Sequence, residues 1–351
     1  MGAKRRRVYV SHAGGTVGMR RTERGWAPER GFLEPLLRSL PEIRNESESI
    51  PEIEFHEHDP LLDSSNMTPR EWQSIAEDVA SRYAEFDGFV ILHGTDTMAY
   101  TTSALSFMLK DLAKPVVVTG SQIPLCEVRN DARRNLLDAL VVAAGSEIPE
   151  VVLVFGGKIL RGNRAVKTSA ESLDAFDSPN YPLLGRAGTR IEIAREHVRP
   201  KPTSGKGLRV RKTGSANVAE LRLFPGIAAP VVANILQPPI QGLVLECYGV
   251  GNAPDRDAAL LGAIRDATAR GVVVVIVSQC LEGVVELGDY AAGAALAHAG
   301  CIGGRDMTKE AAMAKMFHLF AQKHAPEEVK RRMGLDLRGE LTEAKDSGRL
   351  E

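Results

Sequence analysis

Short apolar runs alternate with longer helical patterns along the first half of the chain, and this alternation constrains the fold more than any other feature of the sequence. The runs are rich in β-branched residues, as strands buried on both faces are. Between them, apolar residues recur at the spacing of a helix. Such alternation is typical of parallel strands joined by crossover helices, so the sequence predicts an α/β fold whose larger amino-terminal sheet is parallel or mixed and flanked by helices. The predicted strands are residues 8–11, 88–93, 115–119 and 151–155.

A change of composition predicts the boundary between two domains. Residues 194–216 are rich in Arg, Lys, Pro, Gly and Ser and show no apolar periodicity, which is typical of a linker. Beyond this segment the alternation restarts. We therefore expect an amino-terminal α/β domain over residues 1–193, the linker, and a smaller carboxyl-terminal α/β domain over residues 217–351. The elements expected in the smaller domain are strands at 242–248 and 272–278, a helix at 255–269, a helix capped by Thr308 and a last helix opened by Pro326.

The composition argues against several classes of protein. The 351 residues carry 44 Lys and Arg against 45 Asp and Glu, so there is no excess of positive charge to bind nucleic acid. No apolar stretch approaches the roughly 18 residues that a membrane span needs, and the basic residues 4–7 are not followed by the apolar run of a signal peptide. The cysteines lack the spacing of disulfide frameworks or zinc sites, so we interpret them as reduced thiols of a cytoplasmic protein. They are Cys126, Cys247, Cys280 and Cys301.

A glycine-rich turn directly follows the first predicted strand. Gly14-Gly15-Thr16 matches a dinucleotide fingerprint only in part, because residues 19–31 show no helical pattern and would offer a phosphate no helix N-terminus. Two interpretations remain: a plain glycine turn, or a turn that brings Thr16 to a ligand. Open α/β sheets bind ligands at the carboxyl ends of their strands, which favours the second.

Three further polar segments follow predicted strands or open predicted helices. Thr95 and Asp96 precede a predicted helix, where only one of them can be the N-cap and the other is free to face a ligand. Asp63 and Ser64 form either a capping turn or part of a binding site. Lys167 follows the strand at 151–155 and is either solvated or held inside a site. We expect one crevice at the carboxyl edge of the sheet to gather these residues with the threonine of the first turn.

Read together, these segments resemble the bacterial L-asparaginases, and specifically their cytoplasmic type I branch. Residues 14–19 and 93–98 resemble the two threonine signatures of that family, and the pair is more specific than either alone. The resemblance covers nearly the whole chain. It extends through residues 63–65, 118–122, 161–164, 248–252 and 337–342.

The resemblance implies an amidohydrolase that converts L-asparagine to L-aspartate and ammonia through a threonyl acyl-enzyme, with weaker action on L-glutamine. Thr16 would be the nucleophile, and Lys167 together with Asp96 would polarise Thr95. The sequence leaves open whether Thr95 activates the nucleophile or positions the later water. No cofactor is implied, and the family suggests a homodimer or homotetramer.

Substrate recognition follows from the same resemblance. Asp63 and Asp96 would bind the α-ammonium of the substrate, and Ser64 its α-carboxylate. Thr95 and Ser121 complete the expected substrate-binding set. The chemistry and the recognition of the substrate would therefore share one crevice.

Four residues depart from the family pattern or complement it. Trp26 stands where many members carry a tyrosine on a loop after the nucleophile, and an indole cannot relay a proton. Tyr290 resembles a tyrosine that some type I members place near the nucleophile; the alternative is an ordinary half-buried tyrosine. Val166 and Glu246 replace the threonine and the arginine of a second, regulatory asparagine site, which puts such regulation in doubt.

Two other functions were weighed. An ammonia-supplying subunit of a tRNA-dependent amidotransferase would use the same threonine chemistry, but is expected to carry an extra domain ahead of the first strand, which here begins at Val8. A catalytically silent binding protein is conceivable only because of Trp26.

His56 and His58 would point the same way in a strand, but no third metal ligand is apparent, so the sequence predicts no metal site.

Overall fold

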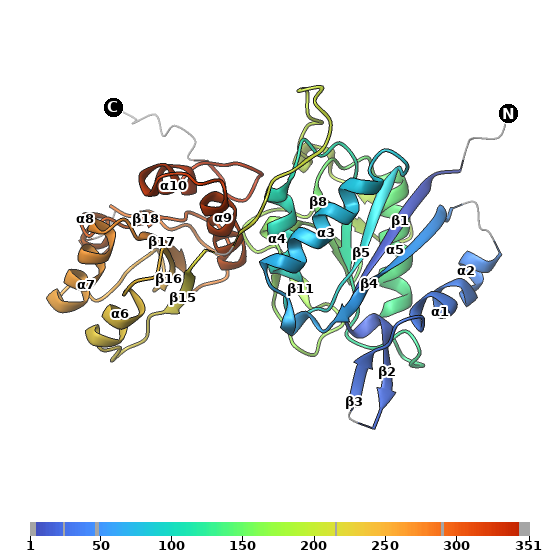
Figure 1. The fold of residues 1–351 in the computed structure, drawn as a ribbon, viewed down its shortest axis with the longest axis horizontal. Helices are drawn as coiled ribbons and strands as arrows, with labels where there is room; N and C mark the ends of the chain where they lie inside the picture. The colour runs from blue at the N-terminus through green and yellow to red at the C-terminus, as the bar shows by residue number, and fades with distance from the viewer. Residues whose placement is uncertain (1–4, 24, 46–48, 215, 289–290, 344–351) are drawn as a thin grey trace. The chain divides into compact units, whose positions relative to one another are not determined.

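The chain divides into two compact α/β units, Met1–Arg211 and Lys212–Glu351 (Figure 1). The structure, a computed structural model, describes residues 5–23, 25–45, 49–214, 216–288 and 291–343. The larger unit has an extended mixed sheet and the smaller a parallel sheet, so the predicted fold class is confirmed. Within the described residues, no helix combines the length and the apolar character needed to cross a bilayer.

The described part of the larger unit contains an eight-stranded sheet in the order β13-β12-β9-β8-β7-β5-β1-β4. The strands from β8 to β4 in this order are parallel, and the other three are antiparallel to their neighbours. The strand bounds are β1 Arg7–Gly14, β4 Glu52–Leu62, β5 Gly88–Leu92, β7 Val116–Thr119, β8 Val151–Phe155, β9 Lys158–Arg161, β12 Gly185–Ala187 and β13 Ile191–Ile193.

Helices cover both faces of this sheet (Figure 1). Side chains alternate along a strand, so Val8 and Val10 of β1 face one way and pack in a core with Leu136 of α5. Tyr9 and Ser11 face the other way and hydrogen-bond α3. The other elements of the unit are α1 Leu33–Ser39, α2 Pro41–Arg44, α3 Pro69–Arg82, α4 Met98–Met108, α5 Ala132–Gly145, β2 Met19–Thr22, β3 Gly25–Pro28, β6 Leu109–Lys110, β10 Val166–Lys167, β11 Phe176–Asp177, β14 Arg209–Val210, η1 Thr16–Gly18, η2 Ser64–Asn66, η3 Gly162–Arg164 and η4 Arg195–His197.

The smaller unit is built on the parallel sheet β15-β16-β17-β18. One face of β16 packs Leu243 against Leu260 of α7, and the other packs Val244 against Met316 of α9. Thr308 caps α9 by accepting a hydrogen bond from the Ala311 amide at 3.0 Å. The bounds are β15 Val218–Arg222, β16 Gly242–Cys247, β17 Val273–Ser278, β18 Ile302–Gly303, α6 Ala229–Ile235, α7 Ala258–Ala269, α8 Ala291–His298, α9 Lys309–Ala321 and α10 Pro326–Met333.

The segment expected to be a linker, residues 194–216, is partly built into the larger unit. Its strand β14 pairs antiparallel with β6, and Arg209 forms an ion pair with Asp111 at 2.5 Å. This pairing uses main-chain hydrogen bonds and one charge contact, so it leaves no apolar periodicity in the sequence.

Candidate active site

The carboxyl ends of four parallel strands lie in register at one edge of the larger sheet. Gly14 of β1 is paired with Leu62 of β4, and Leu92 of β5 is paired with both His12 of β1 and Thr119 of β7. The turns that follow these strands therefore start side by side. They carry Thr16, Ser64, Thr95 and Ser121, four of the residues predicted to form the site.

Glycines let these turns approach one another more closely than any side chain would allow. A β-carbon at Gly15 would lie 2.2 Å from the Gly94 nitrogen, and one at Gly94 would lie 2.4 Å from Ser64 Oγ. A β-carbon at Gly14 would lie 2.0 Å from the Leu62 carbonyl oxygen, and the Gly15 amide donates to that same oxygen at 3.1 Å. The turn that holds Thr16 is thus fixed against the turns that hold Ser64 and residues 94–97, and Thr16 itself is partly exposed.

Lys167 connects the two polar residues that precede α4. Its Nζ donates to Thr95 Oγ1 at 2.8 Å and to Asp96 Oδ1 at 2.7 Å. Thr95 is buried, the Lys167 side chain is 20% exposed, and the Asp96 side chain is 66% exposed. The lysine therefore links a buried hydroxyl to a carboxylate that faces solvent, as the convergence of the motifs predicts.

Gln122 is a member of this network that the sequence analysis did not single out. Its Nε2 donates to the carbonyls of Ala170 and Ser172 at 2.9 and 3.2 Å, so its Oε1 is the atom that accepts from Thr95 Oγ1 at 3.1 Å. Asp131 fixes the turn, because its Oδ2 accepts a hydrogen bond from the main-chain N–H of Gln122 at 3.0 Å. Gln122 lies in the segment 118–122 that resembles the asparaginases, which was the available signal.

Helix capping does not explain the polar pair before α4. The N-cap of α4 is Thr97, whose hydroxyl donates to the Ser64 carbonyl at 2.8 Å, so neither Thr95 nor Asp96 takes the capping position. Asp63 does cap its turn, by accepting from the Ser65 amide at 3.1 Å. Capping therefore accounts for Asp63, but it does not account for Thr95 or Asp96.

A buried histidine supports the turn on which Thr95 lies. Trp72 Nε1 donates to Thr101 Oγ1 at 3.0 Å, which leaves the Thr101 hydroxyl to donate to His93 Nε2 at 2.9 Å. His93 Nδ1 then donates to the Gly94 carbonyl at 2.7 Å. Burial lowers the pKa of His93 to about 4, so the ring is neutral, as this pattern of donors requires.

The remaining predicted residues are placed as follows. Ser64 and Ser121 are buried, and Ser121 Oγ has no hydrogen-bond partner among the described residues. Trp26 lies in the antiparallel hairpin β2-β3, where it is 41% exposed. Tyr290 lies outside the described residues.

The two positions that differ from the regulatory site of some asparaginases are both buried. Val166 precedes Lys167 in β10. Glu246 lies in β16 of the smaller unit, 3.8 Å from Arg222, and burial raises its pKa. A buried apolar residue and a buried carboxyl group are poor substitutes for ligands of an amino acid's carboxylate.

The turn that carries Thr16 lies beside a hydroxyl that Lys167 and Gln122 hold, at the carboxyl edge of the parallel strands, where open α/β sheets bind their ligands. Residues 7–199 match the asparaginase amino-terminal domain, and residues 217–333 match the glutaminase/asparaginase carboxyl-terminal domain. The chain therefore belongs to the asparaginase family of amidohydrolases.

Individual relatives agree with this assignment. The chain is 49% identical to L-asparaginase 1 of Escherichia coli over 97% of this chain and 99% of that one. The crystal structure of L-asparaginase I from Vibrio cholerae matches with a TM-score of 0.89 and 46% identity, over 96% of this chain and 99% of that one. A glutamyl-tRNA(Gln) amidotransferase component from Pyrococcus horikoshii is a more distant relative, 32% identical over 95% of this chain and 76% of its own length.

Proposed function

We propose that this chain is an L-asparaginase that hydrolyses the side-chain amide of L-asparagine through an ester on Thr16. One observation carries the proposal: Lys167 Nζ lies 2.8 Å from Thr95 Oγ1 and 2.7 Å from Asp96 Oδ1, beside the glycine turn that presents Thr16. A threonine hydroxyl is inert at neutral pH unless a neighbouring group removes its proton. We assign this role to the Lys167–Thr95 pair.

In the first half of the reaction, Thr16 Oγ forms a bond to the amide carbon of the substrate and gives up its proton. Thr95, polarised by Lys167, passes this proton toward the leaving nitrogen, so that the C–N bond breaks and ammonia departs. Water then attacks the ester carbon, one of its protons passes to Thr16 Oγ as the bond to that oxygen breaks, and aspartate leaves. Backbone N–H groups at the turns stabilise the oxyanion formed in both halves.

Substrate recognition is assigned to the charged and polar groups around this centre. Asp96 and Asp63 have exposed carboxylates that suit an α-ammonium group. Ser64 suits the α-carboxylate, and the Ser121 hydroxyl, with no partner among the described residues, is a further donor for the substrate. Asparagine and glutamine differ by one methylene, worth only about 1–3 kcal/mol in a pocket, so weaker action on L-glutamine is part of the proposal.

Release of ammonia by the purified full chain, with L-asparagine and L-glutamine in parallel, tests the proposal. We expect turnover of L-asparagine without any partner protein, and an amidotransferase subunit would instead need its partner. Thr16→Ala should lower turnover by several orders of magnitude without unfolding the protein, whereas Thr16→Ser should keep part of the activity because it keeps the hydroxyl. Near-native turnover by Thr16→Ala would show that the nucleophile lies elsewhere.

The cellular setting completes the proposal. The cysteines of the described chain are free thiols, which suits a cytoplasmic enzyme. We also propose assembly into a homodimer or homotetramer, which light scattering on the eluate of a size-exclusion column would measure.

A further inference from the structure

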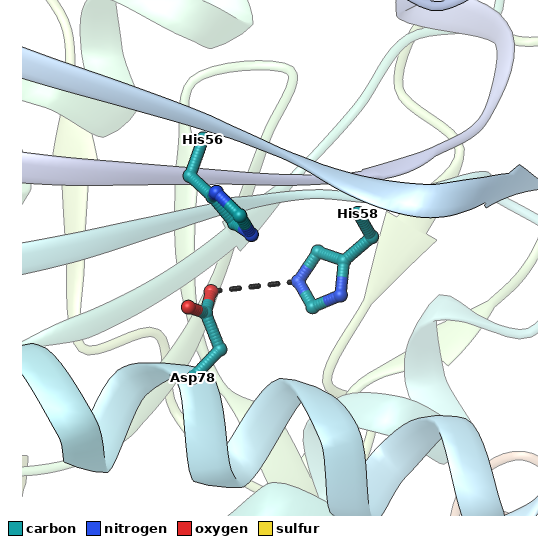
Figure 2. Close-up of side chains that lie close together, drawn as sticks. All are labelled: His56, His58 and Asp78. Atoms are coloured by element: carbon teal, nitrogen blue, oxygen red, sulfur yellow. Dashed lines mark ion pairs between the residues drawn. The ribbon is translucent and has the colours of Figure 1, made fainter.

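Two histidines and an aspartate gather on one face of the larger sheet, and none of the three takes part in the proposed reaction (Figure 2). His56 and His58 lie two residues apart on β4, the edge strand, so both side chains point to the face covered by α3. Asp78 of α3 points back at them. One ligand atom from each residue lies within 4.8 Å of the other two.

We propose that His56, His58 and Asp78 form a binding site for Zn²⁺, with water as the fourth ligand. Two imidazoles and one carboxylate suit zinc, whereas calcium and magnesium prefer oxygen ligands alone. Ligand bonds of about 2.0–2.1 Å in a tetrahedron place the ligand atoms about 3.3 Å apart. His58 Nε2 and Asp78 Oδ2 are already 3.4 Å apart. Ser11 gives its proton to Asp78, so His58 Nε2 donates its own proton to Ser11 Oγ, and this proton would move to Nδ1 of the ring when Nε2 binds the ion. Rotation of the exposed His56 side chain would bring the third atom into place.

The surrounding side chains hold Asp78 as metal-binding carboxylates are usually held. Tyr9 Oη donates to Asp78 Oδ1 at 2.9 Å, and Ser11 Oγ donates to Asp78 Oδ2 at 2.6 Å. The Tyr9 ring also stacks on His56, with centroids 6.2 Å apart.

A catalytic triad of Ser11, His58 and Asp78 does not account for the cluster. In a triad the aspartate orients one ring nitrogen while the other faces the serine. Here Ser11 Oγ and Asp78 Oδ2 both contact the same atom, His58 Nε2, at 2.8 and 3.4 Å. Ser11 is also buried, so its hydroxyl is out of reach of a substrate.

An ion in this site could be reached from solvent and would join two elements of the larger unit. His56 is exposed, which gives an ion a route from solvent, and His58 also lines a neighbouring cavity of about 310 Å³. A bound ion would tie β4 to α3. These two elements flank the turn that carries Asp63 and Ser64, so the ion would restrain the movement of that turn.

Calorimetric titration of the untagged, metal-free full chain with ZnCl₂ tests the site. We expect one tight equivalent of Zn²⁺ in the wild type and at least a tenfold loss of affinity in His56→Gln and in Asp78→Asn. Tyr9→Phe should lose about tenfold, since it removes only a group that positions a ligand. His298→Gln, at an exposed histidine of α8 in the other unit, is the matched control and should bind as the wild type does.

Cobalt substitution identifies the ligands independently. Co²⁺ in the wild type should give visible d–d bands without the near-ultraviolet charge-transfer band of a thiolate, and His56→Gln should lose these bands. Because His56 is exposed, His56→Gln should fold as the wild type does. Absence of zinc binding in the wild type, unchanged affinity in both ligand variants, or a thiolate band from an exposed cysteine would each overturn the proposal.

Discussion

At the scale of a single residue, Lys167 is expected to act through both its charge and the geometry of its hydrogen bonds. Its two donated hydrogen bonds, to Thr95 Oγ1 and Asp96 Oδ1, cannot be made by an apolar side chain of equal length. We expect Lys167→Met to lower kcat by about 100-fold or more, the size of effect typical of proton-transfer groups. Lys167→Arg keeps the charge but not the compact donor geometry, and should recover only part of the loss.

Steady-state kinetics of ammonia release, with thermal melting as the check on folding, measure both lysine variants. Lys167→Met keeps the length of the side chain and leaves behind an Asp96 carboxylate that is 66% exposed, so this change should not alter the melting temperature greatly. Near-native kcat in Lys167→Met would mean that the contact with Thr95 plays no part in the reaction.

Trp26 and Tyr290 form a second pair of residues whose roles can be separated. Trp26 is 41% exposed in the β2-β3 hairpin and has no hydroxyl, so we assign it the role of an apolar cover that excludes water. We expect Trp26→Phe to cost little in kcat and Tyr290→Phe to cost far more, because Tyr290 would supply the phenol near the nucleophile. A large loss in Trp26→Phe together with none in Tyr290→Phe would reverse the assignment.

At the scale of elements, the site depends on how closely the turns after β1 and β5 approach. Gly15 has φ +90° and would place a β-carbon 2.2 Å from the Gly94 nitrogen, whereas Gly226 has φ +92° in open space. The positive φ strains an alanine at either position, by about 1–3 kcal/mol. Only Gly15→Ala must also push apart the turns that carry Thr16 and Thr95. We expect Gly15→Ala to lose activity and more stability, and Gly226→Ala to keep its activity and lose only what the positive φ costs; equal activities would show that the close approach is dispensable.

The elements differ in how visible they are in the sequence. Strands β5, β7 and β8 are buried on both faces and appear as apolar runs, so they could be predicted. Strand β4 was not among the predicted strands, because it is an edge strand and charged residues such as Glu52 and Glu54 interrupt its apolar run. The hairpin β2-β3, with Trp26 in it, is similarly polar and exposed.

Contacts between distant elements were predictable only in outline. The carboxyl ends of parallel strands meet at one edge, and this rule was enough to expect Thr16, Ser64 and Thr95 in one place. It does not account for Lys167, which follows the antiparallel strand β9 and reaches Thr95 from β10. No rule of spacing points to Gln122, which enters through a turn, or to Asp78, which joins His58 from a separate helix. The sequence analysis found no third metal ligand. The packing of α3 against β4 brings Asp78 into that position in the proposed site.

At the scale of the whole molecule, buried neutral histidines set the stability in acid. Burial lowers the pKa of both His12 and His93 to about 4, from about 6.5 in the unfolded chain. Between these values the unfolded chain binds more protons than the folded one, so acid favours unfolding. The stability is fully present above about pH 6.5, falls as the pH drops below that value, and levels off near pH 4. Each histidine contributes at most about 3 kcal/mol to this loss.

Urea unfolding followed across this pH range measures the effect, and His93→Gln isolates one of its sources. The variant loses stability at neutral pH because it disturbs the contacts with Gly94 and Thr101. Its urea midpoint should nevertheless fall less between pH 6.5 and pH 4 than that of the wild type, because one group that takes up a proton on unfolding is gone. His298→Gln, at an exposed histidine, should keep the wild-type slope. A His93→Gln slope as steep as that of the wild type would show that carboxylates, and not His93, govern the acid limit of the molecule.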